Sequence, residues 1–210
     1  MKNFHSLLGK LALIATVTLG SSQVLAQMSP ANVTIRSISY AGSGCPAGSV
    51  SQNLAPDFKA FTLLFDSFIA SVGPAEPISQ KRKNCQINVD FSFPQGWTYA
   101  LVSFDYRGFV DVERDVIGLQ QTSYYFQGAP QTARFKTSMP GPVSRDYQVR
   151  DALDLTATVW SPCGESRSLN INSEVRLDNT RNRNGRGLIT VDSVDGNIAH
   201  TYGIAWKRCW

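Results

Sequence analysis

Few residues of this chain belong to the types that carry acid–base or nucleophilic chemistry. The 210 residues include only two histidines, His5 and His200, and no Gly-x-Ser-x-Gly nucleophile motif. We expect His200 to be a solvated strand residue rather than a catalytic base. The remaining candidates are carboxylates, and Asp90 and Asp105 stand among apolar residues. A carboxylate-dependent extracellular hydrolase is therefore one hypothesis, although no catalytic residue can be assigned.

No motif predicts a metal or a cofactor. The segment Asp192–Asn197 gathers oxygen donors, but it lacks the alternating donors and the final Glu of a calcium loop. Its Asp-Gly-Asn sequence is typical of a tight turn. The spacing of the cysteines contains no Cys-x-x-Cys pair that would indicate zinc. We therefore expect no metal site and no cofactor.

Aromatic residues are the strongest indication of ligand binding. Trp97 and Tyr106 lie in one aromatic-rich run, and Tyr124 and Tyr125 are consecutive. Because neighbouring strand residues point to opposite faces, at least one of the two tyrosines should face away from the side that buries the other. An exposed ring beside polar groups can stack on a sugar. All four residues are therefore candidate ligand-stacking residues, and the competing interpretation is ordinary packing of amphipathic rings.

The first 26 residues have the pattern of a cleaved secretory signal peptide. A basic start with Lys2 and Lys10 precedes the apolar run Leu11–Leu19, and Ala26 closes a cleavage-site pattern. Cleavage leaves residues 27–210 as a single secreted domain, extracellular or periplasmic, with no membrane segment. The formal net charge falls from +4 to about +2, because the removed part carries two lysines and no acid. This small charge gives no support for nucleic-acid binding.

The four cysteines all lie after the signal segment. An even number in an exported chain predicts two disulfides, and three pairings are possible. We favour Cys45–Cys85 and Cys163–Cys209, because each pair joins a separate half of the chain. Each loop would contribute roughly 4 kcal/mol in the chain-entropy model.

Alternation of apolar and polar residues predicts strands for most of the chain. Phe58–Phe68 suits either a helix or a buried strand, and we prefer the strand. Asp195-Gly196-Asn197, between two alternating runs, predicts a hairpin turn. We therefore expect an all-β, single-domain antiparallel β-sandwich or jelly-roll-like fold with two disulfides. The clearest expected strands are Val33–Tyr40, Gln86–Phe93, Trp97–Val112, Leu169–Leu177, Gly187–Ser193 and Ile198–Trp206.

An ordered set of phrases around the cysteines resembles a known family. The phrases are Ser43-Gly44-Cys45-Pro46, Arg82-Lys83-Asn84-Cys85-Gln86, Trp160-Ser161-Pro162-Cys163-Gly164 and Trp206-Lys207-Arg208-Cys209. Together they are similar to the domain-of-unknown-function family 4360, small secreted proteins of fungi and bacteria, over nearly the whole chain after the signal. The resemblance implies a secreted, disulfide-bonded, largely β domain. It brings no catalytic residues.

These observations favour a secreted, non-catalytic β-sandwich that binds a cell-surface or matrix ligand such as a glycan. The exported strand-rich chain, its spare aromatic residues and its lack of a catalytic constellation support this hypothesis. A carboxylate-dependent hydrolase and a structural envelope protein are the two alternatives.

Overall fold

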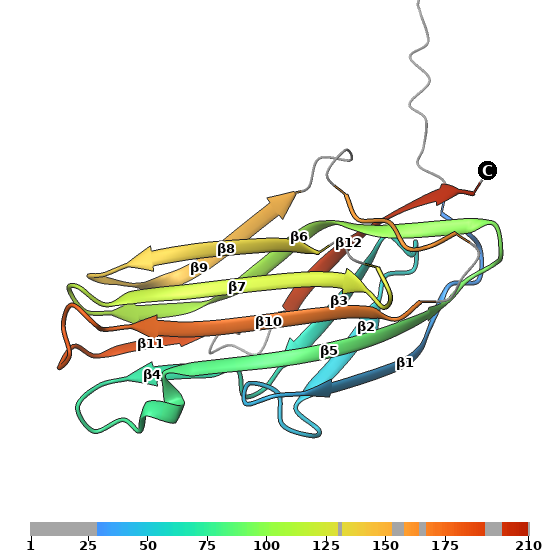
Figure 1. Cartoon of the computed structure of the whole chain (residues 1–210). Coiled ribbons are helices and arrows are strands. Elements are labelled where there is room, and N and C mark those ends of the chain that lie inside the picture. The colour runs from blue at the N-terminus through green and yellow to red at the C-terminus, as the bar shows by residue number, and fades with distance from the viewer. Residues whose placement is uncertain (1–28, 130–131, 153–157, 164–166, 192–198, 210) are drawn as a thin grey trace, which may run out of the picture.

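Two antiparallel β-sheets packed face to face form the fold (Figure 1). This computed structural model describes residues 29–129, 132–152, 158–163, 167–191 and 199–209. The architecture confirms the all-β sandwich expected from the sequence. The described residues include no helix long and apolar enough to cross a membrane.

Five strands form the first sheet. Their spatial order is β1 (Thr34–Ala41), β5 (Arg82–Ser92), β10 (Leu169–Asp178), β7 (Ile117–Phe126) and β8 (Ala133–Pro140). The strands β5 and β10 confirm two of the alternating runs. Their apolar members face the other sheet, and their polar members face outward.

Seven strands form the second sheet. Their order is β2 (Val50–Leu54), β3 (Ala60–Phe65), β12 (Ala199–Arg208), β6 (Trp97–Val112), β11 (Gly187–Thr190) and β4 (Ile69–Val72), with β9 (Val143–Ala152) paired to β6. A short 3-10 helix, η1 (Ile78–Gln80), precedes β5. The strand β3 confirms the preference for a strand in the Phe58–Phe68 segment, over Ala60–Phe65.

The predicted hairpin between the last two runs needs a correction. The strands β11 and β12 pair with different parts of β6 rather than with each other. The long strand β6 explains this, because its Trp97–Asp105 part pairs with β12 and its Val110–Val112 part pairs with β11. The turn itself, Asp195-Gly196-Asn197, lies outside the described residues, as do residues 1–28 with the expected signal peptide.

Aromatic side chains fill the space between the two sheets and pack them against each other. The ring of Phe61 on β3 lies 5.5 Å from that of Phe91 on β5, and the rings of Phe104 and Phe135 are 4.4 Å apart. The Tyr124 hydroxyl on β7 donates a hydrogen bond of 2.9 Å to the carbonyl of Leu101 on β6. Close aromatic packing of this kind holds the two sheets in a fixed relative position, and the residues on their outer faces are fixed with them.

A polar layer crosses the middle of this core. On β7, Tyr124 packs against Phe104 and Gly118 faces Val110, so the intervening Gln120 and Thr122 face the middle of β6. Both side chains are buried, and neither amide atom of Gln120 has a hydrogen-bond partner among the described residues. Such unpaired buried groups are costly, because each loses its bonds to water.

His200 is another buried polar residue of the core, which corrects the expectation of a solvated residue. Its side chain is completely buried, because strand alternation places it on the inner face together with Tyr202. Its Nδ1 lies 3.2 Å from the Tyr202 hydroxyl, and its ring packs edge-on against Tyr106. Burial lowers the pKa of His200 from 6.5 to about 3, so the ring is neutral at physiological pH.

Both disulfides pair as the sequence analysis favoured. Cys45 is bonded to Cys85 and Cys163 to Cys209, with Cα atoms 5.5 Å and 5.9 Å apart. The first bond attaches the chain after β1 to the middle of β5, and the second holds the end of the chain after β12. The first bond is buried in the core, because Cys85 is a β5 residue paired with Ser173 of β10, whereas the second joins two segments outside the strands.

Candidate functional site

Three of the four candidate stacking residues are buried, so their predicted role is corrected. Tyr124 is 0%, Tyr106 2% and Trp97 5% exposed, and none of these rings is accessible to a ligand in this structure. Strand alternation turns Tyr124 inward, where burial raises its pKa to about 12. The guanidinium of Arg208 covers the ring of Trp97, at 4.3 Å from the ring centre.

Tyr125 is the fourth candidate, and it remains accessible. It is half-buried and points to the outer face of the five-stranded sheet, opposite to Tyr124. This confirms the expectation that one of the two tyrosines faces away from the other. Tyr125 lies just beyond the last β7–β8 residue pair, so no β8 residue is paired with it.

The surface beside Tyr125 is rich in side-chain amides. Strands β5, β10 and β7 lie side by side in the sheet (Figure 1), and many of their outward positions are Asn, Gln or Ser. We call this surface the amide face; its members are Gln86, Asn88, Gln121, Ser123, Tyr125, Asn170 and Asn172. Antiparallel register aligns them in rows across the strands, because directly paired residues share one face.

The first row of the amide face is fixed by its own hydrogen bonds. Tyr125, Asn170 and Asn88 are paired across β7, β10 and β5. The Asn88 amide donates to Asn170 Oδ1 at 3.1 Å, and the Asn170 amide donates to the Ser168 carbonyl at 3.4 Å. These contacts hold both amides in defined orientations beside the tyrosine.

The second row is available to a ligand. Ser123, Asn172 and Gln86 are paired across the same three strands. Asn172 and Gln86 are exposed, and none of the three side chains bonds to another described residue. Each amide offers donors and acceptors together, so the row can bond hydroxyl groups in either direction.

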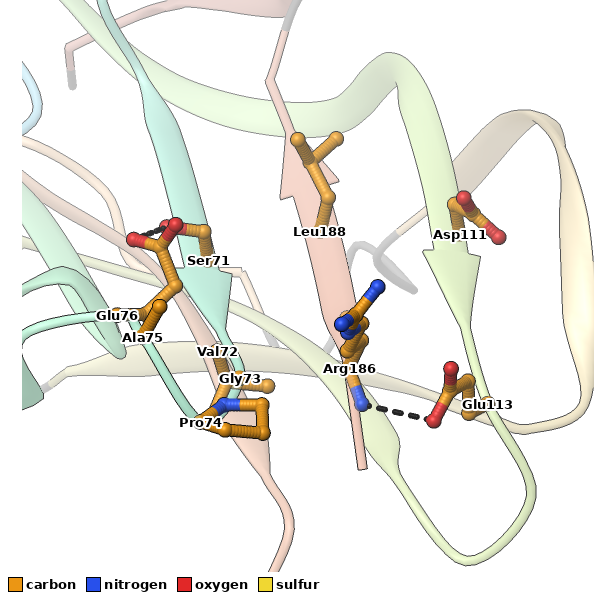
Figure 2. Close-up of a pocket in the computed structure, with 11 residues that line it drawn as sticks. Ser71, Val72, Gly73, Pro74, Ala75, Glu76, Asp111, Glu113, Arg186 and Leu188 are labelled. Atoms are coloured by element: carbon orange, nitrogen blue, oxygen red, sulfur yellow. Dashed lines mark hydrogen bonds between the residues drawn. The ribbon is translucent and has the colours of Figure 1, made fainter. Parts of the chain in front are cut away.

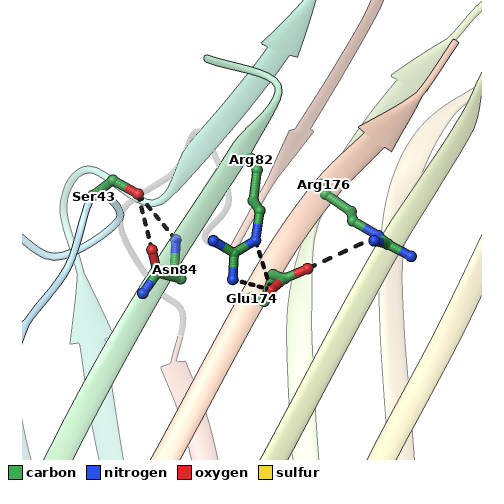
Figure 3. Close-up of polar contacts among 5 residues, drawn as sticks. All are labelled: Ser43, Arg82, Asn84, Glu174 and Arg176. Carbon is green, nitrogen blue, oxygen red and sulfur yellow. Dashed lines mark hydrogen bonds and ion pairs between the residues drawn. The ribbon is translucent and has the colours of Figure 1, made fainter. Parts of the chain in front are cut away.

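Charges gather at the far end of the amide face. Figure 3 shows Glu174 on β10 between Arg82 and Arg176. Arg82 donates to Glu174 Oε2 from Nε at 2.8 Å and from Nη2 at 2.5 Å, whereas Arg176 Nε lies 3.9 Å from Oε1. Nearby, the Ser43 hydroxyl donates to Asn84 Oδ1 at 3.3 Å. The amide face therefore ends in a cluster of ion pairs.

The two carboxylates named for hydrolysis lie on different sheets. Asp90 points outward from β5 and accepts hydrogen bonds from Ser37 and Ser168. Asp105 points outward from β6 and is bonded by Arg150, with Nη2 at 2.6 Å. Because the sheets pack through their inner faces, these two acids lie on opposite outer surfaces. They cannot act on one bond together.

A second surface hollow lies on the outer face of the seven-stranded sheet. It has a volume of about 510 Å³ and is bounded by β4, β11, β6 and the loop after β4. Figure 2 shows Glu76 on one side of Arg186, and Asp111 and Glu113 on the other. The backbone N–H of Arg186 donates to Glu113 Oε2 at 3.0 Å. Within the described ranges, no group of three or more His, Cys, Asp or Glu side chains is placed to hold a metal ion.

Sequence reasoning missed both surfaces for the same reason. The rows of the amide face combine strands that are far apart in the chain, and the hollow combines β4, β6 and β11. A signal for the amide face was present in the alternating polar residues of Gln86–Phe93 and Leu169–Leu177. Only the strand order places those residues next to one another.

Comparison with known proteins supports the family resemblance. The family described as "Domain of unknown function (DUF4360)" matches residues 31–209. An "Uncharacterized secreted protein" of Arthroderma benhamiae is 42% identical over 180 residues, which cover 86% of this chain and 73% of that protein. Among solved structures, TmCBM61 in complex with beta-1,4-galactotriose is similar at 9% identity and a TM-score of 0.26, over 83% of this chain and 90% of that one.

Proposed function

We propose that this chain, which belongs to the DUF4360 family, is a secreted, non-catalytic β-sandwich that binds a glycan through its amide face. The ligand class is a hydroxyl-rich polymer of the cell surface or the extracellular matrix. The observation that carries the proposal is the unbonded row Ser123–Asn172–Gln86 directly beside the half-buried ring of Tyr125.

The physical case rests on what neutral amides do at a surface. Hydroxyl groups of sugars are both donors and acceptors, and side-chain amides complement them without the desolvation cost of a charge. Neighbouring strands lie about 4.8 Å apart, so one row across three strands presents groups over roughly 10 Å. The ring of Tyr125 at the edge supplies an apolar surface on which a sugar ring can stack.

The proposal includes a secreted location for this protein. Residues 1–26 act as a signal peptide, and the mature protein begins at residue 27. The two disulfides suit an oxidising extracellular compartment, and the relative from Arthroderma benhamiae carries the name of a secreted protein. A glycan at the cell surface or in the matrix is the kind of ligand such a protein meets.

The test is retention of oxidised protein, residues 27–210, on a panel of insoluble polysaccharides and cell-wall preparations. We expect retention on at least one polymer, with roughly tenfold weaker binding for Tyr125→Ala or Asn172→Ala, the loss of one stacking or hydrogen-bonding group. Gln52→Ala is the matched control, because Gln52 is an exposed amide on β2 of the other sheet. No retention on any polymer, or equal losses in all three variants, would overturn the proposal.

A further inference from the structure

Another hollow, on the five-stranded sheet, opens at the charged end of the amide face. It has a volume of about 320 Å³ and is lined by Ile78, Lys81, Arg82, Arg176, Leu177 and Asp178. Arg82 and Arg176 belong to β5 and β10, the strands that also carry most of the amide rows. A polymer that lies along these strands would therefore reach the hollow.

The two arginines of this hollow are much more exposed than the carboxylate between them. The side chains of Arg82 and Arg176 are 56% and 49% exposed, whereas that of Glu174 beneath them is 17% exposed. Each guanidinium has five N–H donors, and the single carboxylate of Glu174 leaves most of them free for a further acceptor. Glu174 thus positions two arginines without neutralising both.

The other two charged residues of the hollow, Lys81 and Asp178, form hydrogen bonds with neighbouring residues. Lys81 Nζ donates to Asn179 Oδ1 at 3.0 Å, which orients the ammonium group. Asp178 accepts hydrogen bonds from the backbone N–H and the hydroxyl of Thr180, and these bonds hold its pKa below the usual value. Three cations therefore outnumber the carboxylates of Glu174 and Asp178 by one.

We propose that this hollow binds an acidic substituent of the glycan, so that the ligand of the amide face is an anionic polysaccharide. The inference rests on the proposed function and deepens it. A carboxylate and a sulfate ester share the required chemistry, since both accept paired hydrogen bonds from arginine. Ile78 is 88% exposed at the wall of the hollow and offers an apolar contact for the sugar that carries the acid.

The experiment compares polymers that share one backbone and differ in charge. Soluble hydroxyethyl-cellulose, carboxymethyl-cellulose and cellulose sulfate are titrated with the oxidised protein, and binding is measured at several salt concentrations. We expect one or both anionic polymers to bind roughly tenfold more tightly than the neutral polymer, and Arg176→Ala to remove that difference. Arg145→Ala is the control, because it removes an equal charge from β9 on the other sheet.

The outcomes separate the two proposals. Equal binding of the three polymers, binding of none, or equal losses in Arg176→Ala and Arg145→Ala would overturn the anionic site. If Tyr125→Ala weakens binding to the neutral polymer while Arg176→Ala has no effect on any polymer, the amide face stands and the anionic site falls. If only Arg176→Ala weakens binding, the anionic site stands and the proposed function of the amide face falls. Thermal unfolding of each variant checks that the fold is retained.

Discussion

The buried imidazole of His200 should make the protein less stable in mild acid. The ring packs against Phe65, Tyr106 and Tyr202, and burial is the cause of its lowered pKa. A proton on this ring would lose its hydration, and none of the ring contacts among the described residues supplies an anion to offset that loss. The folded protein therefore keeps His200 neutral down to a pKa of about 3, whereas the unfolded chain has the ordinary value of 6.5.

The sign and size of the effect follow from proton linkage. As the pH falls through 6.5, the unfolded state binds a proton that the folded state does not bind, so the free energy of unfolding decreases. Between pH values of about 7.5 and 5, a group with these two pKa values reduces that free energy by about 2 kcal/mol. The loss ends near the folded pKa of about 3.

Urea unfolding of residues 27–210 at the two pH values measures this loss, and His200→Gln is the control that cannot titrate. We expect the wild type to lose about 2 kcal/mol more than the variant over this interval. A second measurement does not depend on the variant, because His200 is the only histidine after the signal segment. Its imidazole resonance should not titrate between these pH values. A normal titration near pH 6.5, or equal losses in both proteins, would refute the argument.

Two further predictions concern the core and the first disulfide. Replacing Cys45 and Cys85 by alanine should lower the free energy of unfolding by about 4 kcal/mol, because the bond closes a loop with a sequence separation of 40; an unchanged urea midpoint would contradict this. Gln120→Leu should leave thermal stability unchanged or raise it, because it removes two buried unpaired polar atoms. A clear loss of stability, absent from the outward control Gln121→Leu, would indicate that the Gln120 amide is hydrogen-bonded in solution.

Alternation predicted much of the sheet interior, because it reports local burial. It located β5, β6 and β10 closely, and it placed one of the adjacent residues Tyr124 and Tyr125 outward. Applied to β12, the same rule puts His200 on the inner face with Tyr202, but the assumption that a histidine near a turn is solvated led to the wrong expectation. Burial follows from strand position more reliably than from residue type.

What alternation could not predict is the order of the strands. The edge strands β2, β8 and β9 carry polar or charged residues on both faces, so their sequences show only a weak alternation of apolar and polar residues. The rows of the amide face exist only because β10 inserts between β5 and β7, although those strands are far apart in the chain. No single segment contains that information.

Two adjacent glutamines show why composition alone does not identify the site. Gln120 and Gln121 are consecutive on β7, yet the first is buried in the polar layer and the second lies on the amide face. A face selected only for solubility is typically charged along its length, as Lys and Glu resist association most effectively. The row Ser123–Asn172–Gln86 is neutral and unbonded, although Arg134 of β8 is paired with Ser123 at its edge, and Arg82 and Arg176 lie at one end of β5 and β10. A neutral row between charged neighbours supports the proposed recognition of a hydroxyl-rich polymer with an acidic substituent over a purely solvated surface.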